Sequence, residues 1–219
     1  MNLKRITLFT LAALIIGTTA CAVATKRAAP LPRFSYTRSN TPKIYGPIVR
    51  LETKDHHFFC SGFVADDHYV VTAAHCLGGS KSMLINGITP AKRVGGSGRE
   101  DFGLVIGDFR AYQNAKIDFT SAMSLELSNR IVNACGYPEG IHKVVCTPAR
   151  ILGPSFFYHV AIGELYPGMS GGPVYDMRTN TVIGINSQVS PMDAANPHFV
   201  YFARTTGILG AFEIEPKGM

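Results

Sequence analysis

The feature that most constrains this chain is a serine set among glycines, in the stretch Pro-Gly-Met-Ser-Gly-Gly-Pro-Val at residues 167–174. Glycine adopts backbone angles that a Cβ would forbid, so the backbone amides around the serine are free to face a common point. The amides of Gly168 and Ser170 suit such a point, and two converging N–H groups stabilise an oxyanion. Taken alone, the stretch also fits a glycine-rich turn with an incidental serine.

Two further motifs precede this stretch. Thr-Ala-Ala-His-Cys occupies residues 72–76, and Asp-Phe-Gly-Leu-Val occupies residues 101–105. A histidine, an aspartate and a serine therefore follow one another in that order. In this respect the chain resembles the trypsin/chymotrypsin-like serine protease superfamily, whose members carry the three residues in the same order. The resemblance runs from about residue 44 to about residue 212 and is to bacterial exported members, and we expect no PDZ module.

The resemblance implies an all-β fold of two six-stranded antiparallel β-barrels, with the active site between them and a short C-terminal helix ending near Phe212. The residues themselves predict a hairpin of Phe58–Val64 and Tyr69–Thr72, and a second hairpin that turns at Asn86 and Gly87. Residues 102–106 follow as a buried strand. Residues 109–127 are expected to form a polar, irregular connection between the barrels.

The resemblance also implies the roles of the three residues. Ser170 attacks the substrate carbonyl, His75 takes and returns the proton, and Asp101 orients the imidazole. The amides of Gly168 and Ser170 would form the oxyanion hole. The nearest rival to Asp101 is Asp108, which lies after the predicted strand and not at its start. Two further acidic residues lie in the turn before His75 and are expected to face solvent: Asp66 and Asp67.

Four residues are candidates for substrate binding by the same resemblance: Glu164, Ser187, Val189 and His198. Glu164 lies six residues before Ser170, where trypsins carry the acid that selects Lys or Arg. Val189 would narrow the pocket wall, and His198 would favour acidic substrates. These expectations conflict, so the sequence leaves the preferred side chain open.

Met169 departs from many animal relatives, which carry an aspartate directly before the serine. That aspartate pairs with an N-terminal amine freed by zymogen cleavage, and a methionine cannot form the pair. We therefore expect activity that does not depend on such an ion pair.

Five cysteines divide into three groups. Cys60 and Cys76 stand where the resembled family has its disulfide beside the catalytic histidine. Cys135 and Cys146 flank a predicted hairpin, where two short-linked strands allow the roughly 5.5–6 Å Cα separation that a disulfide requires. Cys21 remains, and it lies in the N-terminal segment.

Residues 1–24 have the composition of a signal peptide, with Lys4 and Arg5 before a short apolar run and an Ala-x-Ala cleavage site ending at Ala24. A lipobox that would make Cys21 a lipid anchor is the alternative, although Thr18 stands where a leucine is usual. The apolar run is too short for a membrane span. Residues 25–43 are expected to be a flexible arm, residues 44–212 the protease domain, and residues 213–219 a tail. An exported protein, periplasmic or extracellular, is the expected location.

Composition narrows the function further. Apolar residues make up 46% of the 219 residues, which is enough for a sizeable core in one domain of double-barrel size. The net charge is +6, but the basic residues are scattered, so a nucleic-acid surface is not indicated. No spacing of histidine and cysteine is typical of a metal site, and we expect neither metal nor cofactor.

The sequence thus predicts an exported serine endopeptidase that acts on proteins or peptides through an acyl-enzyme intermediate. A catalytically silent relative that binds protein partners is the alternative, but such relatives usually lose a triad residue. An esterase of the α/β-hydrolase fold is disfavoured, because that fold requires the order serine, acid, histidine.

Overall fold

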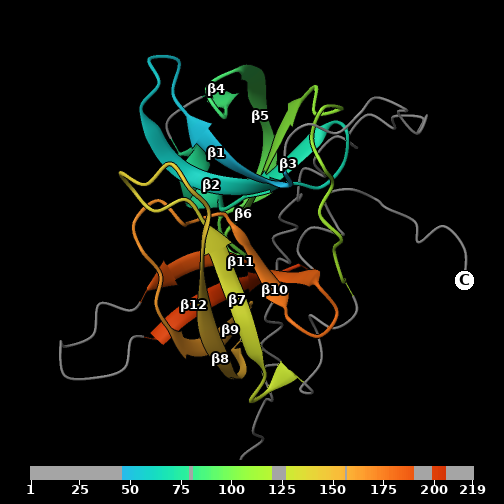
Figure 1. The fold of residues 1–219 in the computed structure, drawn as a ribbon, viewed down its shortest axis with the longest axis vertical. Helices are drawn as coiled ribbons and strands as arrows, with labels where there is room; N and C mark the ends of the chain where they lie inside the picture. Colours follow the sequence, from blue (N-terminus) through green and yellow to red (C-terminus); the bar gives the residue numbers. More distant parts are fainter. Residues whose placement is uncertain (1–45, 79–80, 120–126, 156, 190–198, 206–219) are drawn as a thin grey trace, which may run out of the picture. The chain divides into compact units, whose positions relative to one another are not determined.

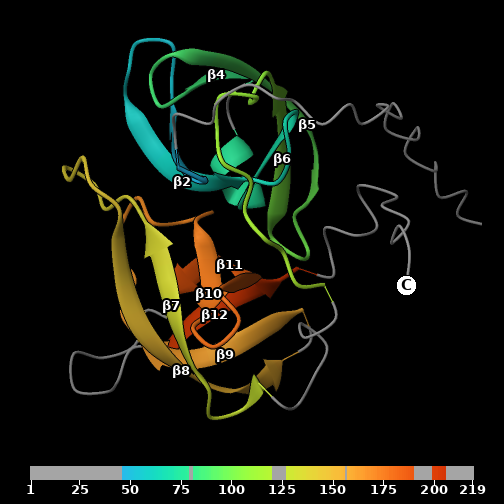
Figure 2. The ribbon, with the colours of Figure 1, turned by 45° about the vertical axis from the view of Figure 1, so that its right-hand side comes forward.

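The computed structural model describes residues 46–78, 81–119, 127–155, 157–189 and 199–205. Twelve strands of these segments form two closed antiparallel barrels of six strands each, and Figures 1 and 2 show each set of strands curling into its own barrel. One 3-10 helix, η1 (Ala74–Leu77), is the only helix of the described residues. The predicted all-β fold of two six-stranded barrels is therefore confirmed. The expected C-terminal helix and residues 1–45 lie outside the described residues.

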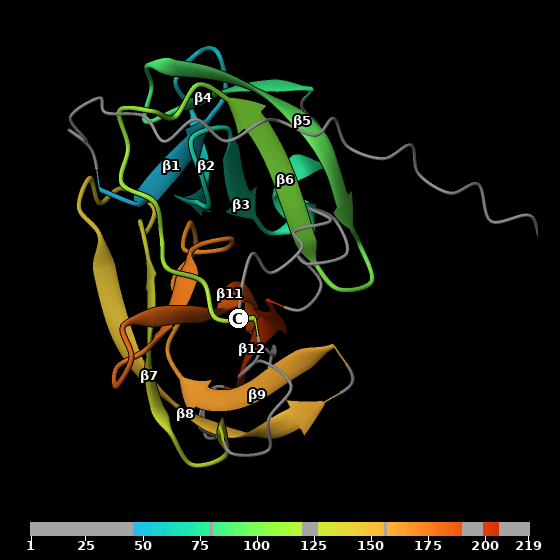
Figure 3. The same cartoon turned by 90° about the vertical axis from the view of Figure 1, so that its right-hand side faces the viewer.

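The two barrels share one strand order, in which the third strand pairs with the sixth. In the first barrel the order is β1-β2-β3-β6-β5-β4, and in the second it is β10-β11-β12-β9-β8-β7. The strands of the first barrel are β1 (Ile48–Glu52), β2 (Phe58–Val64), β3 (Tyr69–Thr72), β4 (Ser82–Ile85), β5 (Thr89–Ser97) and β6 (Phe102–Gly107). Those of the second are β7 (Ile131–Gly136), β8 (Val145–Ser155), β9 (Tyr158–Gly163), β10 (Pro173–Asp176), β11 (Thr181–Val189) and β12 (Phe199–Arg204). Figure 3 shows the long pair β8 and β9 lying side by side.

The hairpin of β2 and β3 forms as the sequence predicts, but its turn is not solvated as expected. Asp66 and Asp67 are both buried. For Asp66 the reason is local, because its Oδ1 accepts hydrogen bonds from the amides of His68 and Tyr69, at 2.7 and 2.8 Å. A short carboxylate side chain that accepts backbone N–H groups in this way replaces a backbone turn and folds against the chain. The expectation that these carboxylates face water was therefore wrong.

The hairpin of β4 and β5 turns at Asn86 and Gly87, which both adopt positive φ angles, 52° and 73°. Asparagine and glycine are the residues that tolerate this conformation, and two such residues in sequence match the twist of the flanking strands. The predicted Asn-Gly turn is confirmed by this geometry.

Each barrel encloses its own apolar core. The first contains mainly β-branched and aliphatic side chains, and residues of β7 to β12 fill the second. The connection between β6 and β7 is less polar than expected, because Phe109 and Tyr112 are buried in the first core and Leu127 in the second. The phenyl ring of Phe109 packs edge-on against Tyr112, with ring centroids 5.8 Å apart. The connection thus contributes large side chains to both cores.

Candidate active site

His75 lies in the short helix η1, directly after β3. Ala73 precedes the helix in an extended conformation, so the chain changes direction at the end of the strand. Cys76 forms a disulfide with Cys60 of β2, with the two Cα atoms 6.0 Å apart. The disulfide ties η1 to the neighbouring strand, while the imidazole of His75 stays half exposed. The histidine is therefore held by its backbone and accessible at its ring.

Asp101 lies at the entrance of β6, next to the end of β3. Thr72 of β3 is the register partner of Gly103, which brings the residues before β6 close to η1. Asp101 has a φ of 48°, a left-handed conformation that few residues other than glycine, asparagine and aspartate adopt. Its carboxylate is nearly buried and accepts from both His75 Nδ1 (2.9 Å) and the His75 backbone amide (3.1 Å).

A third donor to Asp101 comes from the other barrel. The hydroxyl of Ser187 in β11 donates a hydrogen bond to Asp101 Oδ2. Ser187 itself is buried. The sequence analysis named Ser187 only as a substrate-cleft residue, because a contact between positions so far apart in sequence depends on how strands of two barrels meet.

The hydrogen bonds to Asp101 shift the pKa values of both His75 and Asp101. The hydrogen bond to Asp101 raises the pKa of the His75 imidazole above its usual 6.5; partial burial opposes this shift and the carboxylate charge adds to it. Burial raises the pKa of the Asp101 carboxyl, but the bonds from His75 and Ser187 outweigh it and hold that pKa below its usual value. Asp101 is thus an ionised acceptor, which requires the proton of a neutral His75 on Nδ1 and leaves Nε2 as a base.

Asp108, the rival of Asp101, has a different environment. Its exposed carboxylate forms two hydrogen bonds with the Arg110 guanidinium. The Arg110 bonds lower the pKa of Asp108 to about 2. Within the described residues its carboxylate makes no bond to His75, so Asp101 is the acid that the histidine contacts.

Ser170 lies in the turn between Tyr166 and Pro173, which packs against β2 and β3 of the first barrel. The Ser61 amide donates to Ser170 O at 2.8 Å. A Cβ added to Gly171 would meet Thr72 Oγ1 and Ser61 O and lie 2.8 Å from Ala73 N. The turn therefore reaches the residues that lead directly into η1, and only glycine fits at position 171.

The Cys60–Cys76 disulfide links the surroundings of Ser170 and His75. Cys76 Sγ is 3.8 Å from Ser170 O. A ring nitrogen of His75 and the two sulfurs all lie within 4.8 Å of one another. The serine backbone and the imidazole thus flank the same disulfide. This group of three is the one cluster of possible metal ligands among the described residues, but both sulfurs are already joined to each other.

The carbonyls of the serine turn are held by hydrogen bonds on the protein side. Pro167 O accepts from Glu139 N, and Gly168 O accepts from Ser61 Oγ, each at 2.8 Å. Carbonyl and following N–H point in opposite directions across a trans peptide. The Gly168 amide therefore points away from Glu139. Among the described residues, neither this amide nor that of Ser170 donates to a protein acceptor, so both are available to a ligand.

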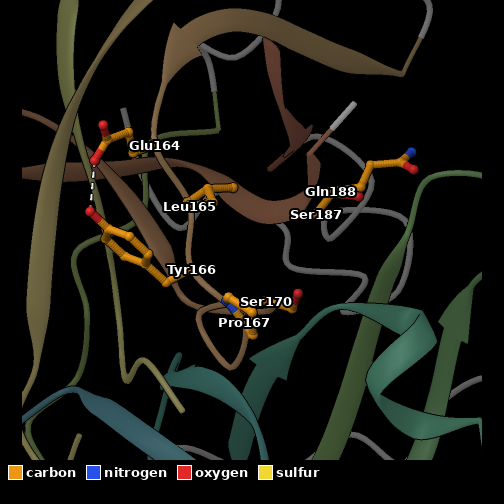
Figure 4. A pocket seen from close by; sticks show the side chains of 7 residues that line it. All are labelled: Glu164, Leu165, Tyr166, Pro167, Ser170, Ser187 and Gln188. Carbon is orange, nitrogen blue, oxygen red and sulfur yellow. Dashed lines mark hydrogen bonds between the residues drawn. The ribbon is translucent and has the colours of Figure 1, made fainter. Parts of the chain in front are cut away.

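A cavity of about 550 Å³ opens beside Ser170. Figure 4 shows Leu165 pointing toward the side of the cavity that holds Ser170 and Ser187, whereas the Glu164 carboxylate lies on the opposite side, bonded to the Tyr166 hydroxyl at 2.6 Å. Besides these residues, Pro167 and Gln188 line the cavity. Of the four candidate substrate residues, Glu164 and Ser187 therefore line it. Val189 ends β11, and His198 lies outside the described residues.

The double barrel with this pairing of histidine and aspartate defines a chymotrypsin-like class of structure. The family model of the trypsin-like peptidase domain matches residues 60–185. The chain therefore belongs to the trypsin-like peptidase family, whose members are serine proteases. No curated protein sequence matches it significantly.

Solved structures share the fold at low sequence identity. A protease from M. tuberculosis in its active form is 19% identical with a TM-score of 0.57, over 87% of this chain and 97% of the other. The serine endoprotease from Yersinia pestis is 17% identical with a TM-score of 0.62, over 76% of this chain and 61% of the other. The HtrA-type protease AlgW with decapeptide is 15% identical with a TM-score of 0.62, over 76% and 63%.

In the part of the chain that the structure describes, no helix has the length and apolar content that crossing a membrane requires.

Both predicted cysteine pairs form disulfides. Cys135 and Cys146 are register partners on β7 and β8, with Cα atoms 4.1 Å apart.

Proposed function

We propose that the chain is an exported serine endopeptidase that cleaves peptide bonds through His75, Asp101 and Ser170. The observation that carries the proposal is the bond from His75 Nδ1 to Asp101, 2.9 Å long, with the sulfur of the next residue, Cys76, only 3.8 Å from Ser170 O. A buried carboxylate, an imidazole and a serine hydroxyl at one site are the parts that acyl transfer needs.

In the proposed reaction, Ser170 Oγ forms a bond to the carbonyl carbon of the substrate while His75 Nε2 takes the hydroxyl proton. The carbonyl oxygen becomes an oxyanion, which the amides of Gly168 and Ser170 stabilise. The C–N bond then breaks, and His75 gives its proton to the leaving amine. A water molecule, deprotonated by His75 in turn, hydrolyses the acyl-enzyme. Asp101 stabilises the imidazolium in both halves of the reaction.

The cavity favours an uncharged substrate side chain. Leu165 points toward the side of the cavity that holds Ser170 and Ser187, whereas Glu164 is exposed and bonded to the Tyr166 hydroxyl. We propose that Leu165 contacts the side chain before the cleaved bond and that Glu164 does not select Lys or Arg. Cleavage of a peptide library tests this, with Glu164→Gln as the variant that should leave the preference unchanged.

Export is supported by the two disulfides, since disulfides persist in oxidising compartments. Residues 1–24, which have the composition of a signal peptide, also favour export. Mass spectrometry of the mature chain would distinguish a start at Thr25 from a lipid-modified Cys21.

A fluorophosphonate probe tests the proposed enzyme directly, because it reacts only with an activated serine. We expect labelling of the wild-type protein at Ser170 and none of Ser170→Ala. A folded wild-type protein that is neither labelled nor able to hydrolyse peptides would instead indicate the silent binding protein.

A further inference from the structure

Asn186 of β11 places a fully buried side-chain amide against the serine turn. Its Nδ2 donates to two carbonyl oxygens, those of Cys135 at 2.8 Å and Met169 at 3.1 Å. Because both partners are acceptors, the NH₂ group must face them and the amide oxygen must face away. Within the described residues that oxygen, although buried, accepts no hydrogen bond.

The backbone of Asn186 holds the same turn. Asn186 O accepts from Gly171 N at 2.7 Å, and Asn186 N donates to Gly172 O at 2.8 Å. The side-chain bond to Met169 thus adds a third connection between this residue and the turn. Met169 is itself fully buried, so its peptide groups have no access to water that could replace a lost partner.

Two donors fix the orientation of one peptide, because Asn186 Nδ2 and Gly172 N each donate to Met169 O at 3.1 Å. Across the trans peptide between Met169 and Ser170, the carbonyl and the N–H point in opposite directions. With Met169 O held toward Asn186, the Ser170 N–H points away from Asn186. A reversed peptide would lose both the Asn186 bond and the Gly172 bond, and it would turn the Ser170 amide inward, where it could not donate to an oxyanion.

We infer that Asn186 is a positioning residue, whose side-chain amide acts with the Gly172 amide to fix the Met169–Ser170 peptide, so that the Ser170 amide is ready to bind the oxyanion. Asn186 has this role only in an enzyme that works as proposed above, so the inference rests on that function. A purely structural role explains the residue less well, since a buried amide with an unpaired oxygen is unfavourable and rare in folded proteins.

Steady-state kinetics of Asn186→Leu and Asn186→Asp test the inference on a peptide that the wild-type protein cleaves. Leucine has a similar size and no donor, and aspartate keeps the shape. Complete loss of one oxyanion donor lowers kcat by about 10²–10³-fold. Because the Gly172 bond to Met169 O remains, we expect kcat to fall by up to about 10²-fold with little change in KM. Thr205→Val is the matched control, because it removes the bond of a buried side chain, directly after β12, to Asp118 O in the connection between β6 and β7, and should leave kcat unchanged.

An inhibitor pair separates positioning from general damage. The aldehyde of the cleaved peptide adds to Ser170 Oγ and places an oxygen in the oxyanion hole, whereas the corresponding alcohol binds without reacting. For Asn186→Leu we expect the aldehyde to lose affinity by the same factor as kcat/KM and the alcohol to keep its affinity. Equal losses for both ligands would overturn the inference.

The pH dependence of Asn186→Asp gives a second readout that misfolding would not produce. A protonated carboxyl has one O–H to donate to Met169 O, but an ionised one repels both carbonyls. Burial among acceptors raises a carboxyl pKa. We therefore expect the ratio of variant to wild-type kcat/KM to rise as the pH is lowered from about 8 to about 6. A ratio that stays flat across this range contradicts the inference.

Failure of the inference and failure of the proposed function look different. If the wild-type protein turns over peptides and Asn186→Leu does so at the same kcat, only the inference is wrong. If the folded wild-type protein neither reacts with a fluorophosphonate nor cleaves any peptide, both are wrong.

Discussion

At the scale of single residues, Asp101 has the largest influence on the protonation of the candidate site. It combines a left-handed backbone, near burial and three donors, from the ring and amide of His75 and the hydroxyl of Ser187. These bonds keep the carboxyl ionised despite burial, and in return the carboxylate raises the pKa of His75. The base strength of the imidazole therefore depends on a buried carboxylate behind it.

Replacing Asp101 with asparagine tests this dependence. Without the carboxylate the pKa of His75 falls, and the amide favours the wrong tautomer. We expect kcat to fall by about 10⁴-fold. The histidine must be neutral to act as base, so wild-type activity is lost as the pH falls through the raised pKa. In Asp101→Asn the acid limb of the kcat/KM profile should lie at lower pH. An acid limb at the wild-type pH would contradict the role given to Asp101.

At the scale of elements, the serine turn is fixed by close packing against the end of β3 and by hydrogen bonds from both barrels. Ser61 of β2 donates to Gly168 O and Ser170 O, and Asn186 of β11 donates to Met169 O. Gly171 is the point of closest approach, and its φ is 83°. The turn is therefore held on several sides before any substrate arrives.

Gly171→Ala should disturb this packing. The new methyl group would meet Ser61 O and Thr72 Oγ1, and a left-handed conformation is strained for alanine. We expect a loss of roughly 2–5 kcal/mol in the free energy of unfolding, together with lower peptidase activity. Gly98→Ala is the control, because nothing lies within 4 Å of a Cβ there. Denaturant unfolding of the two variants measures the difference, and equal stabilities would show that the turn is loosely packed.

The Cys60–Cys76 disulfide also fixes elements relative to one another, since it joins β2 to η1 across a separation of 16 residues. Cross-linking a loop of this length stabilises a domain by about 3 kcal/mol. We expect the double variant Cys60→Ala, Cys76→Ala to lose a comparable free energy of unfolding. Its kcat should also fall, because the disulfide fixes the element that carries His75. A variant with full stability and full kcat would contradict this role.

At the scale of the whole molecule, the sequence predicts the architecture better than the contacts between barrels. The motifs at residues 72–76, 101–105 and 167–174 are local, so they are readable from the chain, as are the Val-rich β3 and the Asn-Gly turn. The connections from Ser61 and Asn186 to the serine turn are not readable, because they depend on register between distant strands. The length of β8 also escaped prediction, since Pro148, Gly153 and Pro154 interrupt the pattern of a strand.

Independence from N-terminal processing is a property of the whole chain. Met169 has no charge to pair with a freed amine, and the peptide after it is held by Asn186. We expect a protein that begins at Thr25 to show its full kcat without a further cut. Activity assays combined with intact-mass measurement check this. Activity that appears only after a later N-terminal cut would contradict it.

The central claim is that Ser170 and His75 act as one catalytic unit, and the kcat values of Ser170→Ala, His75→Ala and the double variant test it most directly. Residues that share one step are not additive. Each single variant should lose about 10⁴-fold or more in kcat, and the double variant should lose no more than the worse single variant. Losses that multiply in the double variant, or a single variant that keeps wild-type kcat, would contradict the account.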